Sequence, residues 1–172
     1  MALASASGLA PGHATVHKAL AAQWALTGLG IDLVRQTLVL LADHDLNAST
    51  FACRVAASTG ASMTACLLAG LCALSGPVHG GASAALLRLI RASETEDATR
   101  VIRQWLDLHG ALPGFGHPLY PEGDARANAL LDRIAADPAL DRLARAVMDE
   151  TGQRPNIDFA LAALTRTYAL PD

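Results

Sequence analysis

The sequence predicts an all-α protein, and three observations lead to that prediction. Apolar residues recur at helical spacing in successive segments, as Val16, Leu20 and Trp24 do near the start of the chain. The composition is 52% hydrophobic but only 4% aromatic, and much of it is alanine, which suits close-packed helices. No segment shows the alternation of apolar and polar residues that is typical of a half-buried strand. With 172 residues, the chain is long enough for one domain or for part of a larger one.

Glycines, prolines and capping residues divide the chain into eight or nine expected helices. Gly28 and Gly30 are expected to end the first helix, and Asp32 to cap the second. Asn47 or Ser49 is expected to cap the third. The expected helices cover residues 15–26, 33–42, a segment from 47–49 to 58, 61–74, 84–92, a segment from 93–96 to 109, 125–137, 139–150 and 159–168.

The helix expected over residues 61–74 is so apolar that it should be buried. Its apolar run of about 12 residues is shorter than the ~20 that span a bilayer. Cys53, Cys66 and Cys72 are odd in number and form no Cys-x-x-Cys pair, so we expect buried thiols in a reducing compartment. Because the N-terminus lacks the features of a secretory signal, the sequence predicts a soluble, cytoplasmic protein.

The charge balance argues against two classes of partner. The chain has 13 basic and 16 acidic residues, so its net charge is −3. That charge does not favour binding to nucleic acid or to an anionic membrane. No cluster of residues has the spacing of metal ligands, so no metal site is expected either.

Residues suited to catalysis lie at breaks between apolar helices. The sharpest break covers residues 75–83, where His79 is surrounded by one proline and three glycines. Glycines let the backbone approach a ligand closely, and a histidine can exchange a proton near neutral pH. Taken alone, this break could also be a helix–helix corner whose histidine caps or packs. At a second break, His44 lies between two aspartates, which would favour its charged form, although a capping turn explains them too.

The longest irregular segment, residues 112–124, contains a lone histidine, His117. Loops of this length are usually functional or disordered. Asp124 is expected to cap the next helix. Arg126 follows in the first turn of that helix, where a positive charge opposes the helix dipole. It is placed either to bind an anion or to form a surface ion pair with Asp124 or Glu122.

The fourth break precedes the last helix, where Asp158 could simply be a helix cap. Two histidines, a carboxylate and an arginine are nevertheless the groups that form a carbon–carbon bond beside a carbonyl. The carboxylate removes a proton, the histidines polarise carbonyl oxygens, and the arginine binds a carboxylate substrate.

The motifs at these breaks are Ala42-Asp43-His44-Asp45 with Asn47-Ala48-Ser49-Thr50, then Gly76-Pro77-Val78-His79-Gly80-Gly81-Ala82, then Gly114-Phe115-Gly116-His117 with Asp124-Ala125-Arg126, and finally Pro155-Asn156-Ile157-Asp158. In their order and separations they resemble the successive signatures of the citrate synthase family. The resemblance extends from about residue 30 to residue 170. Four ordered motifs are far more specific than any one of them.

The resemblance implies condensation of acetyl-CoA with oxaloacetate to citrate and CoA through an enol or enolate. By motif, Asp158 matches the base that removes a methyl proton, His79 the residue that polarises the thioester oxygen, and His117 the acid that activates the oxaloacetate carbonyl. His44 and Arg126 match groups that bind the oxaloacetate carboxylates. The resemblance also assigns coenzyme A contacts to Leu112, Pro113, Gly114, Phe115, Gly116 and Asn156.

The resemblance further implies a two-domain helical fold and a homodimer. An incomplete large domain for dimerisation would cover residues 1–80, a small CoA-binding domain 81–168, and a truncated return to the large domain 169–172. The apolar helices over 50–58 and 61–74 would form the dimer interface, or else the core of the monomer. No metal and no permanently bound cofactor are implied, because the CoA thioester is a substrate.

The sequence also departs from the family pattern. Pro118 follows the loop histidine where many members have a basic residue, and Ala125 replaces the proline of Asp-Pro-Arg. The chain is also shorter than family chains are. Two alternatives therefore stay open: a 2-methylcitrate synthase-like enzyme that uses propionyl-CoA, and a truncated, inactive relative that binds CoA or citrate.

Overall fold

The computed structural model describes residues 15–42, 47–76, 79–80 and 82–171, and within these ranges the chain is helical, as predicted. An isolated bridge between Phe115 and Pro155 is the only β-type pairing among the described residues. In chain order the helices are α2 (Val16–Gln23), α3 (Leu29–Leu40), α4 (Ala48–Ser58), α5 (Met63–Leu74), α6 (Ala82–Thr95), α7 (Ala98–His109), α8 (Ala125–Leu131), α9 (Pro138–Thr151) and α10 (Ile157–Tyr168).

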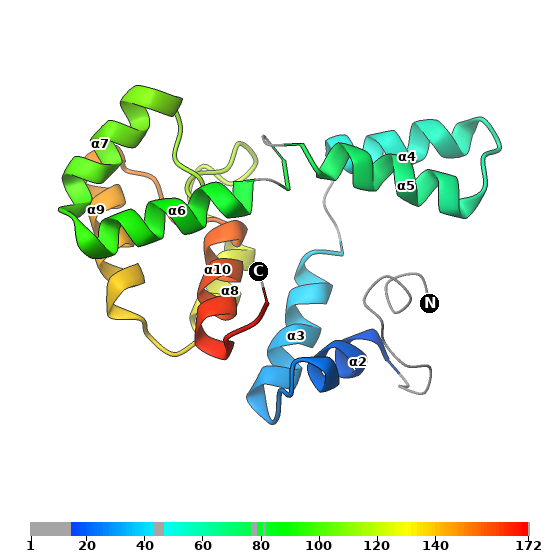
Figure 1. The fold of residues 1–172 in the computed structure, drawn as a ribbon, viewed down its shortest axis with the longest axis horizontal. Coiled ribbons are helices and arrows are strands. Elements are labelled where there is room, and N and C mark those ends of the chain that lie inside the picture. The colour runs from blue at the N-terminus through cyan, green and yellow to red at the C-terminus, as the bar shows by residue number, and fades with distance from the viewer. Residues whose placement is uncertain (1–14, 43–46, 77–78, 81, 172) are drawn as a thin grey trace.

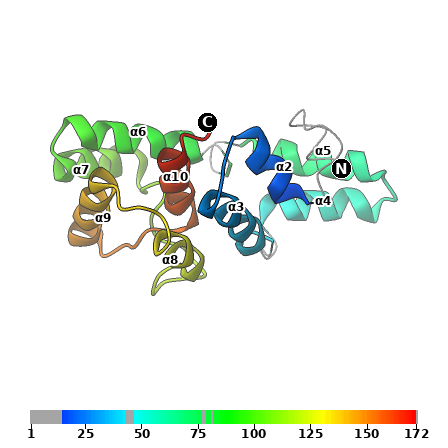
Figure 2. The same cartoon turned by 90° about the horizontal axis from the view of Figure 1, so that it is seen from below.

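The helices form two packed cores and a projecting hairpin (Figure 1). In the larger core, α6, α7, α9 and α10 pack together around Leu89, Ile102 and Leu143. In the smaller core, Leu33 of α3 meets residues of α8 and α10. Helix α10 contributes to both cores, so its position is fixed from two sides. The α4–α5 hairpin extends away from both cores, as Figure 2 also shows.

Side-chain caps explain where most helices begin. Asn47, one of the two predicted alternatives, accepts a hydrogen bond from Thr50 N at 2.8 Å and caps α4. Asp124 caps α8 as predicted, because its carboxylate accepts from Arg126 N at 3.0 Å. Each such bond satisfies a backbone N–H that has no partner inside the helix, which is worth about 1 kcal/mol. The other side-chain caps are Ser62, Asp97, Asp137 and Asn156.

Two predicted boundaries were wrong. Ser93 does not start a helix, because its hydroxyl donates to the Ile90 carbonyl at 2.8 Å inside α6, which continues to Thr95. Asp97 caps the following helix instead. Helix α8 ends at Leu131 rather than at residue 137, since the bonds that follow, from Arg133 N to Leu130 O and from Ile134 N to Leu131 O, span three residues instead of four. Asp137 caps α9 instead.

Gly30 lies inside α3 and does not end a helix, which corrects a third boundary. A Cβ at Gly30 would lie 3.0 Å from the Tyr168 ring, so the glycine allows α3 to approach the end of α10 closely. Asp32 is in the first turn of α3 and is not its cap. Its carboxylate instead binds Arg35 and, from the segment after α8, Arg133.

Helix α5 is not buried within this chain, contrary to the prediction. It packs closely on α4, where a Cβ at Gly70 would lie 2.3 Å from the Cys53 sulfur. Its outward leucines stay in solvent, with Leu68 and Leu71 each 60% exposed. Of the three cysteines only Cys66 is buried, so the expectation of three buried thiols was also wrong. None of the described helices is both long and apolar enough to cross a membrane.

Candidate active site

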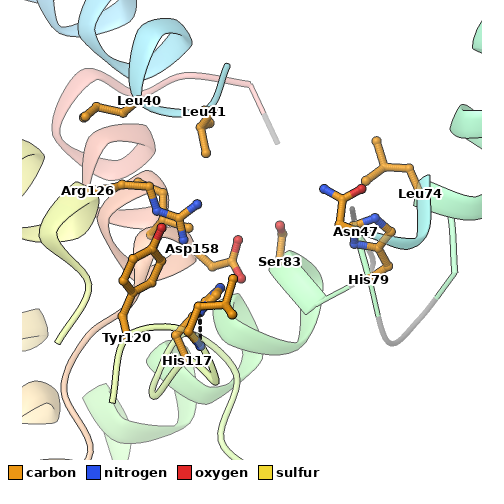
Figure 3. A pocket seen from close by; sticks show the side chains of 13 residues that line it. Leu40, Leu41, Asn47, Leu74, His79, Ser83, His117, Tyr120, Arg126 and Asp158 are labelled. Carbon is orange, nitrogen blue, oxygen red and sulfur yellow. Dashed lines mark hydrogen bonds between the residues drawn. The ribbon is translucent and has the colours of Figure 1, made fainter. Parts of the chain in front are cut away.

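A cavity of about 570 Å³ lies where the two cores meet the base of the α4–α5 hairpin (Figure 3). It brings together four residues that sequence analysis selected from separate breaks: His79, His117, Arg126 and Asp158. Its remaining lining residues are Leu40, Leu41, Asn47, Leu74, Gly80, Ser83, Leu119, Tyr120 and Ile157. The wall is therefore partly apolar, with titratable groups reaching in from three sides.

Asp158 lies in the first turn of α10, and the cap of that helix is Asn156. The Asn156 side-chain oxygen accepts from Asp158 N at 3.0 Å, which leaves the Asp158 carboxylate free to face the cavity. Burial raises the pKa of Asp158, and the positive charges of Arg126 and His117 only partly oppose that rise. The carboxylate is therefore more basic than an aspartate in water.

Arg126 is oriented by the buried carboxylate of Asp124. Arg126 Nε and Nη2 donate to the two oxygens of Asp124, each at 2.9 Å. The Tyr120 ring lies under the guanidinium, 4.9 Å from its carbon to the ring centroid. The ion pair that sequence analysis considered thus exists, but it is buried. Arg126 also lines the cavity, where it can bind an anion.

His117 is held by its own loop. The backbone N–H of Leu119 donates to His117 Nδ1 at 3.2 Å. Because Nδ1 accepts a hydrogen bond, the neutral ring carries its proton on Nε2, which makes Nε2 a donor. The His117 ring also packs on Tyr120, with ring centroids 4.8 Å apart.

His79 is bound from the other side of the cavity by the start of α4. Its Nε2 lies 3.0 Å from Ser49 Oγ. Ser49 Oγ in turn donates to the Asn47 side-chain oxygen at 3.0 Å, so the serine oxygen accepts from Nε2–H. One ring nitrogen is thus used for orientation, and the other, Nδ1, stays available to a ligand.

The His117 loop and the start of α10 are joined by backbone pairing. Gly116 N donates to Arg154 O and Asn156 N donates to Gly114 O, both at 2.9 Å. The Asn156 side chain also donates to Gly116 O at 2.9 Å. His117 is one residue after Gly116 and Asp158 two residues after Asn156, so this pairing holds the two at a set separation.

The residues matched to coenzyme A do not line the main cavity. The side chains of Leu112 and Phe115 are buried in the larger core, so the loop offers its backbone rather than its side chains. Gly116 and Asn156 line a neighbouring cavity of about 190 Å³. Their assignment to coenzyme A stays a prediction.

His44 falls outside the described residues, so its predicted role stays a prediction as well. Sequence analysis overlooked Tyr120 and the role of Ser49. Tyr120 is three residues after His117 in the same loop, which was a usable signal. Ser49 is 30 residues from His79, and no local pattern could have paired them. No group of three or more potential metal ligands occurs among the residues that the structure describes.

The chain is thus an all-α protein with one cavity that brings together an aspartate, two histidines and an arginine. The family model for the citrate synthase C-terminal domain matches residues 8–172, so the chain belongs to the citrate synthase family. It is 33% identical to citrate synthase 2 of Bacillus subtilis over 151 residues, which is 81% of this chain and 41% of that protein. It is 41% identical to 2-methylcitrate synthase of Shewanella oneidensis over 114 residues, covering 63% of this chain and 30% of that protein.

Among solved structures, the fold is similar to citrate synthase from Thermoplasma acidophilum, with a TM-score of 0.74 and 27% identity. That match covers 95% of this chain and 48% of the other. The chain thus spans less than half the length of these relatives.

Proposed function

We propose that the chain carries the active centre of a citrate synthase-type enzyme, which condenses acetyl-CoA with oxaloacetate to citrate and CoA. The observation that carries the proposal is the half-buried Asp158 carboxylate, whose pKa is raised, in one cavity with two histidines and an arginine. A carboxylate of raised basicity is suited to removing a proton from carbon beside a thioester. The Thermoplasma relative was solved with carboxymethyl coenzyme A and oxaloacetate, which are ligands of these two classes.

In the first step Asp158 takes a proton from the acetyl methyl group, the C–H electron pair becomes the carbon–carbon double bond of an enolate, and the C=O π pair moves to the thioester oxygen. In this step His79 acts as the imidazolium: its Nε2–H stays bonded to Ser49, and its Nδ1–H donates to the thioester oxygen as negative charge develops there. A fixed donor in a cavity with little water is worth several kcal/mol at that point. Ser49 contributes by holding the His79 ring in one orientation.

In the second step the thioester C=O of the enolate re-forms, and the enolate carbon attacks the ketone carbon of oxaloacetate to form the new carbon–carbon bond. The ketone C=O electron pair moves to its oxygen, which takes the Nε2 proton of His117 and becomes the hydroxyl of the product. The proton that Asp158 removed from the methyl group then passes through water to His117, which restores both residues. Arg126 binds a substrate carboxylate, and His44 is proposed to bind another. Water then hydrolyses the thioester and releases CoA, whose binding we propose for residues 112–116 and Asn156.

A second candidate is the same reaction with propionyl-CoA, which gives 2-methylcitrate. It is favoured by the 41% identity to the Shewanella 2-methylcitrate synthase. Both candidates use the same groups, so only the acyl chain that the apolar part of the cavity accepts distinguishes them.

We also propose a homodimer that forms through α4 and α5, in the large-domain part of the chain at residues 1–80. The apolar residues exposed along the hairpin support it, because burying such side chains is the usual driving force of stable association. They include Phe51, Val55, Leu67, Leu68 and Leu71.

The test is a thiol-release assay with oxaloacetate and either acetyl-CoA or propionyl-CoA. The wild-type chain should release CoA, and Asp158→Asn should lose about 10²- to 10⁴-fold in rate, the range of general acid–base catalysis. Asp141→Asn is the matched control, because Asp141 is also in the first turn of a helix but is exposed and remote from the cavity. Wild-type release no higher than that of Asp158→Asn would reject the enzyme and favour an inactive, ligand-binding relative.

A further inference from the structure

Asp124 is the only fully buried charged side chain among the residues that the structure describes, with 1% of its surface exposed. It precedes α8 and does not line the main cavity. A buried carboxylate destabilises the folded state unless its oxygens are well paired. The hydrogen-bond partners of Asp124 therefore indicate which elements it holds in place.

Both oxygens of Asp124 have two donors. Oδ1 accepts from Arg126 N at 3.0 Å and Arg126 Nε at 2.9 Å. Oδ2 accepts from Arg126 Nη2 at 2.9 Å and from Ile157 N at 3.0 Å. Three of these bonds orient Arg126, and the fourth reaches the start of α10, one residue before Asp158. A single carboxylate therefore joins the two elements from which Arg126 and Asp158 enter the cavity.

The charge of Asp124 acts on the same pair. Burial alone would raise the pKa of Asp124, but hydrogen bonds from Arg126 and Ile157 hold that pKa below its usual range. Asp124 is therefore negative at neutral pH and offsets part of the positive charge of Arg126. Arg126 and the histidines favour the ionised form of Asp158, whereas Asp124 opposes it.

Within the described ranges, the other elements around Asp158 line its cavities with uncharged side chains. The charged or titratable groups that act on it are Arg126, His117, Asp124 and His79. From α6, the residues that share a cavity with Asp158 are Ser83, Leu86 and Leu87, and α3 contributes Leu40 and Leu41 at its end. Of the described groups that act on Asp158, only Asp124 opposes Arg126 and the histidines, so removing its charge favours the ionised form of Asp158.

We infer that Asp124 is a positioning residue, whose one carboxylate sets both the placement of Arg126 relative to Asp158 and the charge that Asp158 faces. The inference rests on the proposed function for the roles of Arg126 and Asp158, while the coupling between the three side chains is a property of the fold. Loss of Asp124 therefore weakens anion binding and makes Asp158 a poorer base at the same time.

The experiment compares Asp124→Asn with Asp137→Asn. Asp137 is a matched control, since it also caps a helix and pairs with an arginine, Arg166, but lies away from the cavity. The side-chain carboxyl of Asp158 is titrated by ¹³C NMR in each protein. We expect the Asp158 titration to move to lower pH in Asp124→Asn and to stay unchanged in Asp137→Asn.

Kinetics provide the second readout. In Asp124→Asn, KM for oxaloacetate should rise about tenfold or more, which is about 1.4 kcal/mol, and kcat should fall, with the acid limb of the kcat profile at lower pH. Should Asp124→Asn not fold, Asp124→Ser gives the same readouts, because serine is smaller and still caps α8. A folded variant with unchanged Asp158 titration and unchanged KM overturns the inference.

The two proposals fail in different ways. A wild-type protein that releases no CoA rejects the proposed function, while the Asp158 titration still tests the coupling. An active wild type with an Asp124→Asn variant that behaves like Asp137→Asn rejects the coupling alone.

Discussion

Gly114 should be far more sensitive to an added methyl group than other glycines of similar backbone conformation. Gly114 has φ of +80°, and a Cβ there would lie 2.8 Å and 2.9 Å from the two methyl carbons of Leu86. Leu86 is 1% exposed and lies in the larger core, so it has little room to move away. Gly110 has φ of +74°, but a Cβ there would have no neighbour within 4 Å.

The two positions separate backbone strain from overpacking. Gly110→Ala should lower the free energy of unfolding by about 1–2 kcal/mol, because alanine is strained in the left-handed conformation. Gly114→Ala should lower it by the same amount and by about 1–3 kcal/mol more, because the added methyl group is forced into a packed core. The free energy of unfolding, measured by urea denaturation with circular dichroism, should therefore fall by about 2–5 kcal/mol in Gly114→Ala.

The structure also predicts a functional consequence. Gly114 O accepts from Asn156 N, so a backbone shift at Gly114 disturbs the pairing that sets His117 relative to Asp158. Gly114→Ala should lose activity when it is still folded, whereas Gly110→Ala should not. Equal losses of stability in the two variants would refute the reasoning, because they would mean that the contact with Leu86 relaxes at no cost.

Two further predictions concern stability and assembly. Because the pKa of Asp158 is raised, its contribution to stability is full below the unfolded-state value, about 3.9, and is lost as pH rises through the folded value. Asp158→Asn should therefore unfold at higher urea than wild type at pH 7, and the difference should shrink near pH 4; a less stable variant at pH 7 would contradict this. Replacing Leu68 and Leu71 together by glutamate should convert a dimer to a monomer in sedimentation velocity, while Leu108 on α7, which is more exposed still, should tolerate glutamate. An unchanged sedimentation coefficient would locate the interface elsewhere.

Local chemistry accounts for most of what could be predicted from the sequence. Asn47 and Asp124 were recognised as caps, because a capping side chain bonds to a backbone N–H only two or three residues away. The boundary at Ser93 failed for the opposite reason. A serine can also bond back to a carbonyl inside a helix, and the sequence does not say which partner it takes.

The sequence by itself determined the helical class, through its residue types. The order of its motifs determined the selection of His79, His117, Arg126 and Asp158. Tertiary structure alone decided what surrounds them. Ser49 meets His79 across 30 residues, and Asp124 meets Ile157 across 33. The basicity of Asp158 and the exposure of α5 depend on how much water neighbouring elements exclude. That quantity is a sum over contacts distant in sequence, so no local pattern contains it.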